Sequence, residues 1–184
     1  MSGNEIERIY SEIISIKDVI SRDGTPSDIV AYEAIAAKSL ILSTASYFEK
    51  VVRELLIKHA ESIFNSTALI SFLDKQALYR KYHTLFDWDR TNINKFIRLF
   101  GNEFYDFMEP RLTDEKMINA IKEFMFIGQI RNELVHNNFS EYSIEITSED
   151  IKRKFDMALP LMPFLVRSLV EFEQAKLQAP ASND

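Results

Sequence analysis

Three histidines, His59, His83 and His136, are the side chains of this sequence best suited to proton transfer near neutral pH, because imidazole alone has an ordinary pKa in that range. The sequence contains no cysteine, which excludes a disulfide framework, a cysteine-ligated zinc site and a thiol nucleophile. It also has no glycine-rich phosphate loop and no pair of histidines at helical spacing for zinc. Acid–base chemistry is therefore expected to use one of the three histidines.

The segment Gly128–Asn138 holds the most informative pattern, because Arg131 is followed by Asn132 and, five positions after the arginine, by His136. On a helix, positions five apart lie about 140° from each other around the axis. One copy therefore aims Arg131 and His136 partly away from each other, and two copies packed across a two-fold axis would bring two such sets into one cleft. Gly128 lies on the His136 face, where it either admits a second helix or fits a neighbour within the chain.

This Arg-Asn-x-x-x-His pattern resembles the signature of the HEPN superfamily, in which four to six residues separate an arginine from a histidine and a polar residue often follows the arginine. The layout is similar too, since a long early helix carrying Ser46–Leu56 precedes the motif and one more helix follows it. The likeness is greatest to the RiboL-PSP-like group and covers roughly residues 28–175. It implies an all-α, HEPN-like antiparallel helical bundle, with residues 1–178 as a single domain.

The resemblance also implies an activity, that of a metal-independent endoribonuclease whose site forms across a homodimer and needs no cofactor. His136 would take the proton from an RNA 2′-hydroxyl or protonate the leaving 5′-oxygen, and Arg131 would hold the phosphate. Asn132 would orient His136 or the phosphate. The implied setting is bacterial defence or a toxin–antitoxin pair, in which an antitoxin such as a nucleotidyltransferase-like protein would be the partner.

Two other interpretations stay open beside this one. Some HEPN proteins are non-catalytic, so the chain is alternatively a module for dimerisation, partner binding or nucleotide binding. It is also compatible with a helical adaptor unrelated to HEPN. In both cases Arg131 and Asn132 would cap the helix end, and His136 would bond a backbone carbonyl.

Three further features have both a functional and a plain structural interpretation. Arg53 and His59 repeat the motif spacing, but they lie inside a predicted long helix and lack the polar residue after the arginine. Glu49, if half-buried, would need a cationic partner, for which Arg131 is the obvious choice; a surface glutamate is the simpler interpretation. The basic run Lys152–Lys154 either contacts phosphates or forms a solvated face.

Glycine and proline are rare, at 4 and 5 of 184 residues, which favours long helices over a turn-rich sandwich or barrel. Apolar spacing predicts a helix over residues 4–21 and long helices at about 27–64, 113–136 and 148–174. Two prolines should kink the last of them. Shorter helical pieces are expected at 66–82, 91–100 and 103–108, a region whose many aromatic residues form a core or stack bases. Residues 142–146 alternate like a short strand or extended loop, and 179–184 are expected to be a disordered tail.

Charge and hydropathy limit the location and the partners. The net charge of −6 makes generic nucleic-acid binding unfavourable. Residues 50–100, however, carry 9 basic and 5 acidic groups, which form either a local basic surface or mixed solvated helix faces. The N-terminus is polar and acidic, unlike a signal peptide. The longest apolar run, Met157–Val166, holds two prolines and is too short to span a bilayer. We therefore expect a cytoplasmic protein without a membrane segment.

Overall fold

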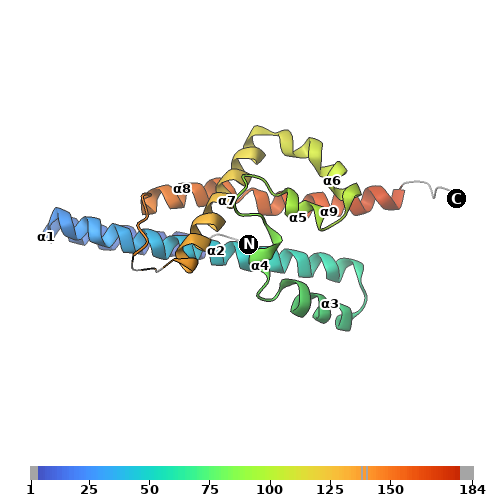
Figure 1. The fold of residues 1–184 in the computed structure, drawn as a ribbon, viewed down its shortest axis with the longest axis horizontal. Coiled ribbons are helices and arrows are strands. Elements are labelled where there is room, and N and C mark those ends of the chain that lie inside the picture. The colour runs from blue at the N-terminus through green and yellow to red at the C-terminus, as the bar shows by residue number, and fades with distance from the viewer. Residues whose placement is uncertain (1–3, 138, 140, 179–184) are drawn as a thin grey trace.

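The computed structural model describes residues 4–137, 139 and 141–178, and every regular element among them is a helix. The predicted all-α fold is therefore confirmed. In Figure 1, α1 runs from the middle of the molecule to one end, α2 returns along its length, and α9 reaches the opposite end. The predicted tail, 179–184, lies outside the described residues. The elements in chain order are α1 (Asn4–Asp23), α2 (Pro26–Ile63), α3 (Thr67–Leu73), a π-helical turn (Asp74–Leu78), α4 (Tyr82–Leu85), α5 (Asn94–Arg98), α6 (Asn102–Met108), a 3-10 turn (Glu109–Thr113), α7 (Glu115–His136), α8 (Ser148–Ala158) and α9 (Leu161–Gln178).

The long helix α2 is the central core element and lies within one residue of the predicted 27–64. Its start is set by Pro26 and by a capping box, in which the Asp28 carboxylate accepts from the Thr25 amide at 2.8 Å and Thr25 Oγ1 accepts from the Asp28 amide at 3.3 Å. Of the described helices, α2 alone has the length and hydropathy of a membrane span, with 39% of the apolar window buried in the protein. Core helices of soluble proteins can meet the same two criteria, so length and hydropathy alone do not make α2 a membrane span.

Aromatic side chains join α2 to the helices that pack on it. The Phe48 ring of α2 lies 5.2 Å from that of Phe124 on α7 and 5.4 Å from that of Phe155 on α8, between ring centroids. All three rings are fully buried. Most aromatic residues between 65 and 112 also belong to the core, as one of the two interpretations predicted. Phe72 and Tyr79 are exceptions, because they are 66% and 51% exposed.

The predicted single helix over 148–174 is wrong, because the chain forms α8 and α9 as two helices separated at Leu159–Pro160. Proline has no amide hydrogen, so Pro160 cannot continue the hydrogen bonds of α8, and Pro163 lies in the first turn of α9, where proline is tolerated; the kink therefore becomes a break. A capping box of Thr147 and Asp150 begins α8. Residues 142–146 have no regular secondary structure, so the extended-loop alternative applies there.

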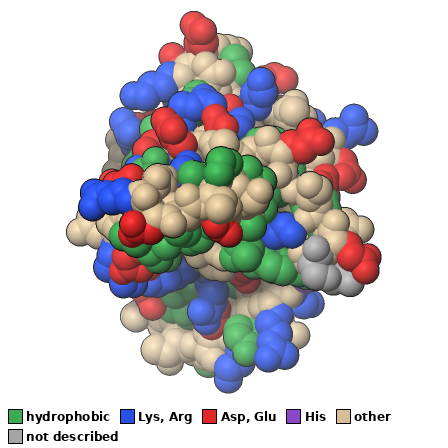
Figure 2. Space-filling view, turned by 90° about the vertical axis from the view of Figure 1, so that its left-hand side faces the viewer, with side chains coloured by type: hydrophobic (Ala, Val, Ile, Leu, Met, Phe, Trp, Pro, Cys, Tyr) green, Lys and Arg blue, Asp and Glu red, His purple; other side chains and the backbone are tan. Residues whose placement is uncertain are grey.

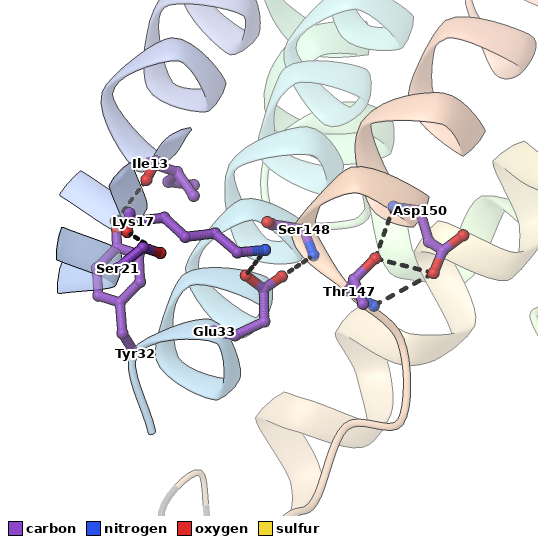
Figure 3. Close-up of polar contacts among 8 residues, drawn as sticks. All are labelled: Ile13, Lys17, Ser21, Tyr32, Glu33, Thr147, Ser148 and Asp150. Atoms are coloured by element: carbon purple, nitrogen blue, oxygen red, sulfur yellow. Dashed lines mark hydrogen bonds and ion pairs between the residues drawn. The ribbon is translucent and has the colours of Figure 1, made fainter. Parts of the chain in front are cut away.

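The start of α8 is fixed to α2 by Glu33, whose carboxylate accepts from the Ser148 amide at 2.5 Å and pairs with Lys17 Nζ of α1 at 2.9 Å (Figure 3). Burial raises the pKa of Glu33, but the hydrogen bonds from Ser148 and Lys17 lower it by more, so that the net pKa is below its usual value. This contact determines where the loop between α7 and α8 ends.

We expect Glu33→Gln to lower the free energy of unfolding by about 1–2 kcal/mol at pH 7, because it removes the charge that both partners bind. A carboxylate whose pKa is lower in the folded than in the unfolded state stabilises the folded state at pH values above its unfolded pKa. This stabilisation is lost as the pH falls through the folded pKa. The difference from wild type should therefore shrink towards about pH 3 in urea titrations. Glu12→Gln is the matched control, since Glu12 pairs with Arg8 on the exposed face of α1. If Glu33→Gln lowered the free energy of unfolding equally at pH 7 and at about pH 3, the lowered pKa of Glu33 would not be the cause of its stabilising effect.

Candidate functional site

Helix α7 carries the motif and is capped at both ends. Asp114 accepts from the Met117 amide at 3.1 Å, so the helix begins at Glu115 and the predicted start at Thr113 is too early. At the other end, the backbone amide and the side-chain amide of Asn137 both donate to the Glu133 carbonyl, at 2.9 and 2.8 Å. These caps hold the end of the helix at His136, where the sequence predicted it.

The loop after α7 is tied back to the bundle by two contacts. Lys38 of α2, which is buried, donates from Nζ to the Phe139 carbonyl at 2.7 Å. The Tyr142 hydroxyl donates to the Glu133 carboxylate. Burial, followed by that hydrogen bond, raises the pKa of Tyr142 to about 12, so that it remains a donor at neutral pH. The loop that follows the motif is therefore anchored at two points, on α2 and on α7.

Asn132 and His136 line one open pocket of about 420 Å³, opposite the segment Phe86–Asp89. His136 is exposed and Asn132 is half-buried. Arg131 is half-buried, lies outside the residues that line this pocket, and donates from Nη1 to Asn132 Oδ1 at 3.2 Å. The protein thus brings Asn132 and His136 together, while the direction of Arg131 diverges as the helical spacing predicted.

Glu49 and Arg131 both lie near enough to Tyr82 for their charges to act on its hydroxyl. Burial raises the pKa of Tyr82 well above its usual value, the Glu49 charge raises it further, and the Arg131 charge lowers it. Glu49 is half-buried, but Arg131 makes its hydrogen bond with Asn132 rather than with Glu49. Among the described residues, Glu49 therefore has no direct ion pair with Arg131, the cationic partner that its functional interpretation named.

Gly128 accommodates the Trp88 ring of the same chain. A Cβ built on Gly128 would lie 1.9 Å from Trp88 Cζ3, far closer than any allowed contact. The indole Nε1 donates to the His83 carbonyl at 2.9 Å, and its ring lies 4.9 Å from that of Phe86. Of the two alternatives for Gly128, the internal neighbour is correct. This contact docks the segment 86–89 on α7 and forms the wall opposite His136.

Two carboxylates, Asp87 and Asp89, belong to that wall and line the pocket with His136. They could not be identified from the sequence, because no local spacing links them to α7. Ionised carboxylates accept hydrogen bonds but repel a phosphate. A phosphate bound near His136 would therefore need cations from outside this pocket, such as Arg131 or groups of a second copy.

The second arginine–histidine pair is structural. Arg53 donates from Nε and Nη2 to the two carboxylate oxygens of Asp74, both at 2.7 Å, which joins α2 to the π-helical turn. His59 is half-buried, and burial lowers its pKa. The two side chains therefore serve the packing of α2.

The basic run in α8 is occupied by ion pairs rather than left free as a cationic surface. Lys154 pairs with the buried Glu123 of α7 at 2.7 Å. The remaining contacts are Lys152 with Glu7 and Asp156, both at 2.7 Å, and Arg153 with Asp150 at 3.0 Å. These pairs fix α8 on α1 and α7. Among the described residues, no group of three or more histidine or acidic side chains is arranged to hold a metal ion.

Comparison with known proteins supports the sequence resemblance. The family model for RiboL-PSP-HEPN matches residues 4–171, which include every helix described above except the end of α9. No curated protein and no solved structure matches the chain. Because the family model extends over most of the sequence, including the motif on α7, the chain belongs to the RiboL-PSP-HEPN family.

Proposed function

We propose that the chain is a metal-independent endoribonuclease of HEPN type. The observation that carries the proposal is the position of His136: it is exposed at the capped end of α7, in an open pocket that it shares with Asn132. A general acid or base must reach both solvent and substrate, and His136 meets that condition. His59, in contrast, is half-buried inside α2.

The proposed reaction is an internal transfer at phosphorus. The RNA 2′-oxygen loses its proton to a histidine and attacks the adjacent phosphate, and the bond to the 5′-oxygen breaks. The 5′-oxygen takes up a proton, so the products are a 2′,3′-cyclic phosphate and a 5′-hydroxyl. Arg131 binds the phosphate and stabilises the charge that develops on it, and Asn132 orients the Arg131 guanidinium through the 3.2 Å hydrogen bond.

We further propose that two copies form the site together. Within one copy Arg131 lies outside the His136 pocket, and Asp87 and Asp89 disfavour a phosphate there. A two-fold partner would supply the missing arginine, so that the Arg131 of each copy acts with the His136 of the other and the dimer holds two such sets. Figure 2 views the end where α1 meets α2, and hydrophobic side chains gather across it. Exposed apolar residues of these helices include Val30 and Ile35, 70% and 61% exposed, and such residues are typical of a surface covered by a partner.

The biological setting follows from the family and is also a proposal. We expect a cytoplasmic enzyme in bacterial defence or in a toxin–antitoxin pair, with RNA as substrate and a nucleotidyltransferase-like antitoxin as candidate partner. Co-purification with the product of the adjacent gene tests this part. A nucleotidyltransferase-like neighbour that suppresses cleavage supports the assignment, and a neighbour without effect on cleavage counts against it.

Arg131→Lys is expected to lower RNA cleavage by about 10²-fold, because an ammonium group lacks the two-pronged donor geometry that fits a phosphate. The assay uses labelled single-stranded RNA in EDTA and measures cleavage rates for wild type, Arg131→Lys and the control Arg98→Lys. Arg98 lies on α5 against Tyr105, outside the site. Wild type and control should cleave equally, and a 2′-O-methyl group at the cut position should abolish cleavage. Full activity of Arg131→Lys would contradict the role of Arg131.

A wild-type protein that dimerises but cleaves no RNA would instead favour the second function, a non-catalytic module for dimerisation, partner binding or nucleotide binding. Cleavage that requires Mg²⁺ would contradict the proposed chemistry.

A further inference from the structure

A pocket of about 320 Å³ lies between α2 and the turn that follows the π-helical segment. Its buried floor is formed by Leu78 and Tyr82, and the half-buried Glu49 lies at its side. The exposed residues of its rim include three cations and one aromatic ring: Lys50, Arg53, Tyr79 and Arg80. The acidic group thus lies deeper than the cations. A ligand with an anionic group and a hydrogen-bond donor would bind with the anion at the rim.

Two guanidinium groups lie near the Tyr79 ring. The ring is 51% exposed, and the Cζ atoms of Arg53 and Arg80 lie 6.0 and 5.2 Å from its centroid. Arg53 is held in place by Asp74 through Nε and Nη2, which leaves its Nη1 donors available. An exposed aromatic ring flanked by cations is the arrangement on which unstacked bases bind.

Arg80 adopts a backbone conformation that its residue type disfavours. Its φ is +58°, and it is the one residue other than glycine with a positive φ in the described chain. Glycine would adopt this conformation without steric cost. Strain of this kind is concentrated at functional sites. An arginine in this conformation, beside Tyr79 and at the rim of a pocket, indicates that its side chain has a role outside the fold.

We propose that this pocket is a subsite for one unstacked nucleotide of single-stranded RNA. The base stacks on Tyr79 and turns an amino edge towards Glu49, while its phosphate lies against Arg80 and Lys50. Bases in a duplex cannot enter such a pocket, so the subsite selects single strands. The inference rests on the proposed function and names where that substrate binds.

The test measures the Kd of a fluorescein-labelled, fully 2′-O-methylated single-stranded RNA by anisotropy, so that binding is read without cleavage. Tyr79→Ala should raise the Kd about tenfold, as expected for the loss of one stacked base, whereas Tyr79→Phe should stay near wild type. Arg80→Gly should raise the Kd and reduce the steepness of log Kd against log salt by about 0.7, equivalent to one phosphate contact. Glycine adopts the backbone conformation of this position readily, so the melting temperature of the Arg80→Gly variant should not be lower than that of wild type.

Arg98→Ala is the matched control, because it removes an equal charge and a guanidinium that lies over Tyr105, away from the pocket. It should leave the Kd within about twofold of wild type, and a duplex of the same sequence should bind wild type at least tenfold more weakly. Equal Kd values for wild type, Tyr79→Ala and Arg80→Gly would overturn the inference, even if RNA is cleaved. If Arg80→Gly alone weakened RNA binding and Tyr79→Ala did not, the pocket would be a simple anion site, and the inferred nucleotide subsite would be overturned. Tyr79-dependent binding without any cleavage would support the subsite and contradict the proposed enzyme.

Discussion

Replacing His136 with alanine should lower the rate of RNA cleavage by about 10²–10⁴-fold, the usual contribution of general acid–base catalysis. His136 is exposed at the end of α7, so its removal leaves no buried group unpaired and should not affect stability. Single-turnover cleavage in EDTA, with thermal unfolding of the same samples, separates an effect on chemistry from an effect on folding.

His83→Ala is the matched control for this experiment. His83 is also exposed, and its backbone carbonyl, which accepts from Trp88, is retained in the variant. It should cleave at the wild-type rate. If His136→Ala cleaved as fast as His83→Ala, His136 would not be the proton-transfer group, and the open pocket at the end of α7 would not be the active site.

Gly128→Ala should lower the free energy of unfolding by about 3 kcal/mol, at the upper end of the usual cost of overpacking. The new methyl group would lie 1.9 Å from Trp88 Cζ3, and the indole has no room to retreat because it packs against Phe86 and Phe124. Urea titration should show a lower midpoint at every protein concentration, because the clash is internal.

A second substitution makes this prediction specific. The Trp88→Leu substitution removes the indole and relieves the clash. Gly128→Ala should therefore lower the free energy of unfolding less in the Trp88→Leu variant than in wild type, so that a double-mutant cycle shows strong coupling between the two positions. A Gly128→Ala variant with wild-type stability but a weaker dimer would contradict the internal contact and would place Gly128 at an interface between copies.

The helices that follow local rules could be predicted from the sequence. Apolar spacing depends on residues close in sequence, and it predicts the limits of α2 and the start of α8 closely. The capping boxes of Thr25 with Asp28 and of Thr147 with Asp150 fix these starts in the structure. The break between α8 and α9 was underestimated as a kink, since two prolines three residues apart act together. The predicted helix over 66–82 instead ends in a π-helical turn at Leu78, before the positive φ of Arg80.

The candidate site was predictable only where it lies on a single helix. The order of Arg131, Asn132 and His136 on α7 gives their relative directions, and the structure agrees with them. The wall of the pocket comes from residues 86–89, whose position depends on the fit of Trp88 over Gly128 some forty residues away. Contacts of this kind depend on packing between distant segments, and no local spacing in the sequence encodes them.

The most direct test of a shared site is subunit complementation. Arg131→Ala and His136→Ala should each be nearly inactive alone, but a mixed dimer retains one intact arginine and one intact histidine. After exchange of subunits, an equal mixture should therefore recover about a quarter of the wild-type cleavage rate, because half of the dimers are mixed and each has one of two intact sets. A mixture that is no more active than the separate variants would contradict a ribonuclease site formed by two copies of this chain.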